Sequence, residues 1–200
     1  MKRLKFKLFG TEIYISFLFG AVIAVMLATD RTGMALPSLF AVFMHEMGHL
    51  FCMWVQDSSP KSIKLIPASV QINTGIGSSY KKDIIVALCG PAVNFVLFFT
   101  LFFNYLAFKN ELTLYYALLN LIIGGFNMLP VKGLDGGTVL FSILAKKLDL
   151  NRAMLIMRLV TLFIAAIALV TAITLTLRGK VNVSLYIIAI YLIVMSIIKM

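Results

Sequence analysis

The sequence predicts an all-α polytopic membrane protein with about six transmembrane helices and a short β-strand region at the cytoplasmic surface. Hydrophobic residues make up 61% of the 200 residues, charged residues make up only 13%, and the mean hydropathy is +0.99. A soluble domain is about half apolar and about a quarter charged, so it could not bury this much apolar surface. The net charge of +10 does not indicate a nucleic-acid partner, because the basic residues stand in short clusters between long uncharged runs.

Charged residues bracket a series of apolar runs, each near the ~20 residues that a helix needs to cross a membrane. Backbone polar groups in lipid must be satisfied within their own segment, so runs of this length are expected to be helical. The predicted spans are residues 12–29, 35–55, 84–108, 113–146, 153–177 and 182–199. The fourth span is expected to be broken, with one helix at 113–130 and a continuation at 134–146. We find no repeat and no appended soluble domain, which predicts one membrane-embedded domain over residues 1–200.

Two stretches outside these spans have the composition of strands. Residues 1–11 alternate basic and apolar side chains, and a period of two predicts a strand. Residues 61–80 are rich in Ile, Val, Ser and Thr, with Gly75 and Gly77 as turn residues, which predicts one or two short strands.

The distribution of basic residues predicts the orientation. A cytoplasmic N-terminus places thirteen of the 18 Lys and Arg residues on the cytoplasmic side and four on the opposite side. Cytoplasmic loops of membrane proteins carry such an excess. The sequence therefore predicts a multi-pass protein of the cell membrane with both termini, and the surface strands, in the cytoplasm.

The only two histidines, His45 and His49, stand in the segment FMHEMGHLF within the second predicted span. A spacing of four places both imidazoles on one helix face, where they can bind one zinc ion, and Glu46 can act as general base on a water molecule. The HExxH pattern is short enough to occur by chance. Inside an apolar run, however, ionisable groups are costly and mark functional sites, so a zinc site is the favoured interpretation.

A catalytic zinc site usually has three protein ligands, and the chain has no third histidine. Apart from Glu46, the one acidic residue flanked by apolar sequence is Asp135, in NMLPVKGLDGGTVLF. Its proline and glycine neighbours predict a broken helix that lines a cavity. An alternative is that Asp135 caps a helix at 136–146, and the two roles are compatible. Cys52 and Cys89 are weaker candidate ligands.

The two histidines lie ten and six residues from the predicted cytoplasmic end of their span, which is about 15 and 9 Å along a helix. We therefore expect a polar cavity that opens from the cytoplasm. The candidates to line it are Asn94, Asn127 and Lys132.

Three motifs in series resemble the site-2 protease family of intramembrane zinc metalloproteases. They are HEMGH in the second span, the G-P-x-x-N element formed by Gly90, Pro91 and Asn94, and the N-x-x-P-x(4)-D-G-G pattern that starts at Asn127. The compact layout is most similar to the sporulation stage IV protease subgroup. The chain departs from that subgroup where Gly133 replaces a second proline and Ala68-Ser69 replaces a glycine pair.

The resemblance implies one Zn²⁺ per chain, bound by His45, His49 and Asp135, with Glu46 as the catalytic residue. It also implies that Asn127 sits beside the site, where it can help to hold the substrate or the oxyanion. Asn94 is taken as a second residue on the substrate side.

The implied function is hydrolysis of peptide bonds in or near transmembrane segments of membrane-associated proteins. The implied partners are the substrate protein, a membrane regulator protein and the lipid bilayer. A helical substrate must unwind, and residues 61–80 can offer it a strand edge. The alternative for this segment is an amphipathic loop whose lysines contact anionic lipid.

Two other function classes fit part of the sequence. An ion-coupled transporter would use a broken helix and intramembrane acids, which explains Asp135 but not the glutamate of HExxH. A catalytically inactive membrane scaffold would have lost zinc ligands or the base, and all of these positions are present.

Overall fold

The computed structural model describes residues 3–8, 11–57, 62–66, 69–73 and 79–197. The chain divides into two compact units, Met1–Phe126 and Asn127–Met200. Each unit is described by itself.

The first unit carries a four-stranded sheet in the order β1-β2-β3-β4. Strands β1 (Arg3–Leu8) and β2 (Thr11–Ser16) are antiparallel, β2 and β3 (Ser62–Ile66) are parallel, and β3 and β4 (Ser69–Asn73) are antiparallel. Both predicted stretches contain strands, and the segment 61–80 supplies two of them. The predicted turn residues Gly75 and Gly77 lie outside the described residues.

The prediction that the first span begins at residue 12 is wrong. Residues 12–16 belong to β2, which pairs with β1 along its whole length, from Arg3 opposite Ser16 to Leu8 opposite Thr11. Uncharged residues fit a strand as well as a helix, and the β-branched and aromatic run of Ile13, Tyr14 and Ile15 favours the strand. Helix α1 (Phe17–Thr29) begins directly after it and has 13 residues.

The turn between α1 and α2 (Ala35–Val55) is organised by Asp30. Its carboxylate accepts hydrogen bonds from the backbone N–H groups of Thr32, Gly33 and Ala35 and from the Thr32 hydroxyl, at 2.7–3.1 Å. These donors stabilise the charged form and lower the pKa of Asp30 to about 2. The turn therefore fixes where α2 begins, at the residue that the sequence predicts.

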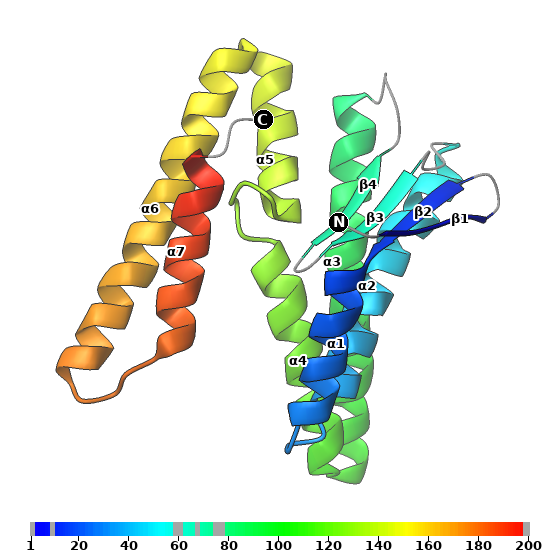
Figure 1. The fold of residues 1–200 in the computed structure, drawn as a ribbon, viewed down its shortest axis with the longest axis vertical. Coiled ribbons are helices and arrows are strands. Elements are labelled where there is room, and N and C mark those ends of the chain that lie inside the picture. The colour runs from blue at the N-terminus through cyan, green and yellow to red at the C-terminus, as the bar shows by residue number, and fades with distance from the viewer. Residues whose placement is uncertain (1–2, 9–10, 58–61, 67–68, 74–78, 198–200) are drawn as a thin grey trace. The chain divides into compact units, whose positions relative to one another are not determined.

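Helix α2 packs against α3 (Tyr80–Phe108), and the two lie side by side in Figure 1. A side chain at Gly48 of α2 would place its Cβ 2.6 Å from the backbone oxygen of Cys89. The glycine lets the two backbones approach, as small residues do between helices in lipid. Helix α3 begins four residues before the predicted span, because Ser79 caps it by accepting from the Lys81 N–H.

The helix predicted over 113–146 is interrupted, as expected, although its role as a membrane span stays a prediction. Seven residues, 128–134, separate α4 (Glu111–Asn127) from α5 (Asp135–Lys147). Added side chains at Gly136 and Gly137 would collide with the backbone carbonyls of Met128 and Val131, so the two glycines let the connecting loop fold back onto α5. Gly133 in this loop has a φ of 92°, which proline cannot adopt. The backbone conformation at residue 133 therefore suits the glycine found here and excludes the proline of the subgroup pattern.

The second unit is completed by α6 (Leu150–Leu177) and α7 (Val183–Ile197), which form a helical hairpin (Figure 1). Its buried core consists of Val131, Ala165 and Leu192, so the connecting loop is anchored to α6 and α7.

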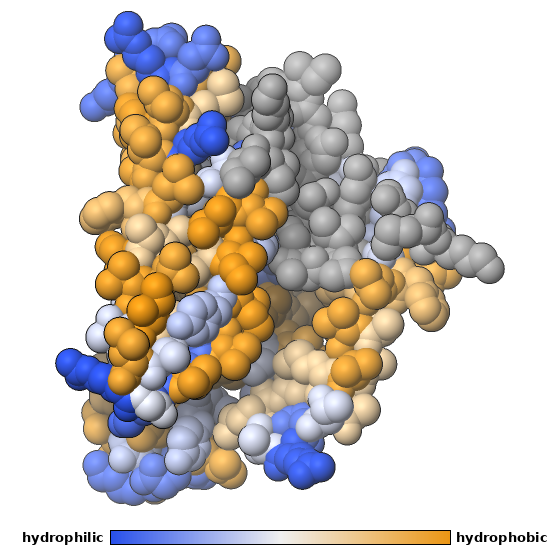
Figure 2. Space-filling model, turned by 60° about the vertical axis from the view of Figure 1, so that its left-hand side comes forward, coloured by the Kyte–Doolittle hydropathy of each residue, from blue (hydrophilic) through white to orange (hydrophobic). Residues whose placement is uncertain are grey.

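Among the described helices, α2, α3 and α6 are long and apolar enough to cross a membrane, while α1 and the Val183–Val194 part of α7 are apolar but shorter. Large apolar side chains are openly exposed, as in Trp54 at 69% and Phe163 at 67%. Figure 2 shows apolar side chains over the middle of the visible helices and hydrophilic ones at their ends. The chain is therefore mostly helical with a lipid-compatible surface, and the count of six spans stays a prediction.

Candidate metal centre

The predicted histidine pair is brought together by α2. His45 and His49 are 4% and 7% exposed, and their Nε2 atoms lie 3.2 Å apart. The two rings meet edge to face, with centroids 4.8 Å apart. Successive helical turns place the rings on one face, so two nitrogen atoms converge at one buried point.

The tautomer of His49 is fixed by the backbone of α3. Its Nδ1 lies 2.8 Å from the carbonyl oxygen of Val86, which can only accept a hydrogen bond. Nδ1 must therefore carry the proton, and Nε2 presents its lone pair toward His45.

The tautomer of His45 is fixed by a side chain of α3. Its Nδ1 lies 2.6 Å from the Oδ1 of Asn94, which is fully buried. The amide of Asn94 donates to the backbone oxygen of Ala41 at 3.2 Å and to the Oδ1 of Asn120 at 3.0 Å. Because the NH₂ group is directed at these two acceptors, the oxygen faces His45, and Nδ1 of His45 is the donor.

Gly90 makes room for the pair. A Cβ at this position would collide with the ring of His49 and would lie 2.9 Å from the Nε2 of His45. No side chain larger than hydrogen fits there while the imidazoles keep their places. The G-P-x-x-N element thus supplies both the space for the pair, through Gly90, and the acceptor for His45, through Asn94.

The donor chemistry fits a zinc ion. The two imidazoles direct their Nε2 atoms at one point, and each ring donates its Nδ1–H to an oxygen, as zinc-binding histidines do. Glu46 follows His45 on α2 and is half-buried. The first unit therefore holds two candidate ligands and a carboxylate beside them.

The other predicted site residues belong to the second unit. Asp135 is half-buried at the first position of α5, and Leu134 takes the N-cap position, so the alternative that Asp135 is the N-cap of that helix is wrong. Asn127 is half-buried, and the Lys132 N–H donates to the hydroxyl of Thr161 at 3.1 Å. The ligand role of Asp135 and the substrate roles of Asn94 and Asn127 stay predictions.

Asn120 on α4 is a site residue that the sequence analysis missed. It is 5% exposed, accepts from Asn94 and donates to the backbone oxygen of Tyr116 at 2.9 Å. A signal for it was present, since an asparagine in the middle of the apolar run LLNLII is costly in lipid unless it has partners.

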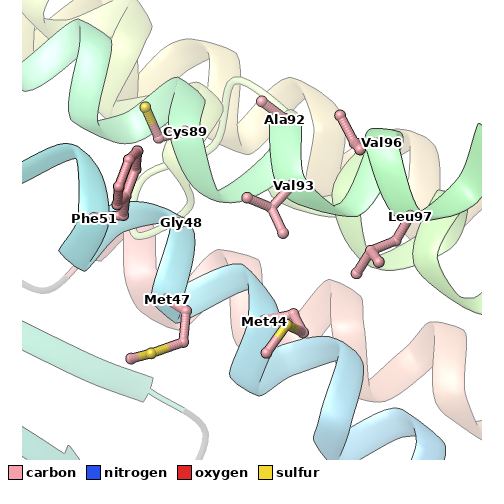
Figure 3. A pocket seen from close by; sticks show the side chains of 9 residues that line it. All are labelled: Met44, Met47, Gly48, Phe51, Cys89, Ala92, Val93, Val96 and Leu97. Carbon is pink, nitrogen blue, oxygen red and sulfur yellow. The ribbon is translucent and has the colours of Figure 1, made fainter.

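The two cysteines are free thiols, and the Sγ of Cys52 accepts from the Gln56 amide at 3.2 Å. Cys89 lines an apolar recess of about 460 Å³ along α2 and α3 (Figure 3). The other residues that line it are Met44, Met47, Gly48, Phe51, Ala92, Val93, Val96 and Leu97. No imidazole or carboxylate lines this recess, so it is not the place for hydrolytic chemistry.

The chain is similar to known proteins both in sequence and in fold. No protein-family profile matches the chain. The chain is 28% identical over 158 residues to the zinc metalloprotease MJ0392 of Methanocaldococcus jannaschii, an alignment that covers 71% of this chain and 45% of that protein. The chain thus spans less than half the length of this relative.

The structural comparison covers both chains almost completely. A solved site-2 protease from Methanocaldococcus jannaschii superposes with a TM-score of 0.69 over 100% of this chain and 98% of the other, at 21% identity. With its mainly helical body, its small sheet and this superposition, the protein has the fold of a site-2 protease.

Proposed function

We propose that this protein is an intramembrane zinc metalloprotease that hydrolyses peptide bonds in or near transmembrane segments of membrane-associated proteins. The observation that carries the proposal is the buried pair of His45 and His49, whose Nε2 atoms converge at 3.2 Å within an apolar helix. Glu46 stands beside the pair on the same helix. The similarity to a protein named as a zinc metalloprotease, and the site-2 protease fold, support the same activity.

Asp135 is the third zinc ligand in this proposal. With His45 and His49 it offers two imidazole nitrogens and one carboxylate, a donor set that suits a single zinc ion and leaves a fourth position open. The second unit supports this role, because Asp135 begins α5 and is followed by the close-packed Gly136 and Gly137. One zinc ion per chain follows from a single set of ligands.

The reaction is peptide hydrolysis. A bound zinc ion would polarise the scissile carbonyl and make a water molecule more acidic. Glu46 takes a proton from the attacking water and returns it to the leaving amine. Asn127 holds the substrate or the oxyanion. Val86 and Asn94 hold the two imidazole rings in orientation through their hydrogen bonds at Nδ1.

A helical substrate hides its peptide bonds and must unwind before it is cut. Strand β4 supports a pairing role, because β4 and β1 are the two edges of the described sheet and an edge strand has backbone groups available for another chain. In this proposal an extended piece of substrate pairs with β4.

The proposal includes the number of membrane crossings and the orientation of the chain. The chain crosses the cell membrane six times, both termini and the sheet face the cytoplasm, and the charge distribution supports this orientation. The resemblance to the sporulation stage IV protease subgroup supports control by a membrane regulator protein.

The zinc content of the purified protein tests the metal centre. We expect about one zinc per chain in the wild type and a near-complete loss in His45→Ala, because one of the two imidazole ligands is gone. Asn104→Ala is the matched control, since Asn104 is exposed on α3. Zinc-free wild type after purification without chelators, or full zinc in His45→Ala, would contradict the proposal.

A further inference from the structure

Three polar side chains from three different helices form one buried chain of hydrogen bonds. It runs from His45 on α2 through Asn94 on α3 to Asn120 on α4, with steps of 2.6 and 3.0 Å. Their exposed fractions are 4%, 0% and 5%. Burying polar groups in apolar helices is costly unless they are hydrogen-bonded, and in a membrane span such groups mark function.

Two backbone oxygens, which can only accept, set the direction of these hydrogen bonds. The Tyr116 oxygen accepts from the Asn120 amide at 2.9 Å, which turns the Oδ1 of Asn120 toward Asn94. That Oδ1 and the oxygen of Ala41 both accept from the Asn94 amide. The Oδ1 of Asn94 is thereby turned to His45, whose Nδ1 must donate to it.

The two histidines differ in how firmly their tautomers are held. His49 donates to the Val86 carbonyl, a backbone group that cannot rotate. His45 donates to a side-chain amide, which a half-turn would convert from acceptor to donor. With Asn94 flipped, its NH₂ would face Nδ1 of His45 and favour a proton on Nε2, where the metal must bind.

We infer that Asn120 is a positioning residue of the metal centre, which acts through Asn94 to keep the metal-binding tautomer of His45. This role rests on the proposed zinc site. In the present arrangement a flip of Asn94 would place its oxygen against two acceptor oxygens, those of Ala41 and Asn120. Without Asn120 only the Ala41 oxygen opposes the flip.

The direct test is the tautomer of His45 in the metal-free full-length protein, read from ¹⁵N chemical shifts at about pH 8.5, above the ordinary histidine pKa of about 6.5. The chain has only two histidines, so the spectrum is simple. In the wild type both rings should carry the proton on Nδ1. In Asn120→Leu, His45 should become a mixture of tautomers, while His49, held by Val86, should not change and serves as the internal control.

Zinc affinity, measured by chelator competition, is the second readout. Asn120→Leu should bind zinc about tenfold more weakly, at the lower end of the effect of residues that orient metal ligands. Asn120→Asp should stay near wild type, because a neutral carboxylic acid can accept from Asn94 and donate to the Tyr116 oxygen. If Asn120→Leu does not accumulate, Asn120→Ala replaces it. Asn104→Leu is the matched control on the exposed side of α3.

A double-mutant cycle separates this role from a general loss of packing. If Asn120 acts through Asn94, Asn120→Leu should add nothing to the zinc affinity already lost in Asn94→Leu. An unchanged His45 tautomer in Asn120→Leu, or losses that add fully, would overturn the inference even if the wild type binds zinc. A wild type without zinc would instead refute the proposed function, and the tautomer measurement would still decide the role of Asn120.

Discussion

His45, His49 and Asn94 are polar side chains held out of solvent within helices that are otherwise apolar. Each has its hydrogen bonds directed by a neighbour, so their orientations are determined before any ligand arrives. Such pre-orientation lowers the cost of binding a metal ion. The pair itself was predicted from the spacing of four in HEMGH, because helix geometry makes this spacing sufficient.

The partner of each ring could not be predicted in the same way. The acceptor for His49 is a backbone oxygen, that of Val86, and backbone groups leave no trace in a sequence. Asn94 was expected on the substrate side, whereas its observed contacts are with His45, Ala41 and Asn120. These contacts of Asn94 depend on how α2, α3 and α4 pack together, which a local sequence pattern does not show.

Gly90→Ala tests the space beside the pair. The new methyl group would collide with the His49 ring and crowd the Nε2 of His45, so zinc affinity should fall by about tenfold or more. Chelator competition measures the loss. Gly125→Ala on α4 is the matched control, since a Cβ there meets no atom within 4 Å. Equal zinc affinity in the two variants would show that the ring positions do not depend on Gly90.

At the scale of elements, apolar runs predicted the helices well wherever charges or prolines bracket them. The helix at 35–55 and the interruption before Asp135 are both present in the structure. The assignment failed at residues 12–16, because a run without charges does not by itself distinguish a strand from a helix. Pairing with β1 and β3 decides the structure there, and such long-range pairing is not visible in a local pattern.

Proline variants of β4 test whether this edge strand captures the substrate. Proline cannot donate to a ladder, and alternate residues of an edge strand direct their N–H groups to opposite sides. Val70 and Ile72 therefore share one direction and Gln71 has the other. A proline at a position whose N–H points away from β3 should leave thermal stability and zinc content unchanged. These outward-pointing variants should still impair cleavage of a co-expressed membrane substrate.

The lipid-contact alternative gives the opposite pattern. Outward-pointing prolines would then be tolerated, and replacing Lys61 and Lys64 with alanine would reduce cleavage more. Lys61 lies outside the described residues, and Lys64 belongs to β3.

At the scale of the whole molecule, the candidate ligands come from both compact units. The histidines belong to the first unit and Asp135 to the second, 86 residues after His49 in the chain. The spacing of the two histidines and the apolar flanks of Asp135 made these residues candidate ligands, and the order of motifs, through a family resemblance, implied them as one set. Composition alone predicted only a membrane protein. The solved site-2 protease matches the fold along the whole chain.

Asp135→Ala tests the contribution of the second unit. Loss of the third ligand should lower zinc content well below one per chain, as measured by elemental analysis of the purified protein. Asp149→Ala is the control, because Asp149 caps α6 and pairs with Arg152 at 3.1 Å on the exposed surface. Full zinc occupancy in Asp135→Ala would transfer the third-ligand role to another group, with Cys52 and Cys89 the next to test.

Cleavage by Glu46→Gln tests the central claim most directly. The substitution keeps the shape of the side chain and leaves the proposed ligands in place, so zinc content should stay at about one per chain. Loss of the general base should slow cleavage of a co-reconstituted single-span test protein by at least about a hundredfold. Cleavage by the wild type with none detectable in zinc-loaded Glu46→Gln is the predicted result. Equal cleavage by the two proteins would contradict the assignment of Glu46 and, with it, the hydrolytic mechanism.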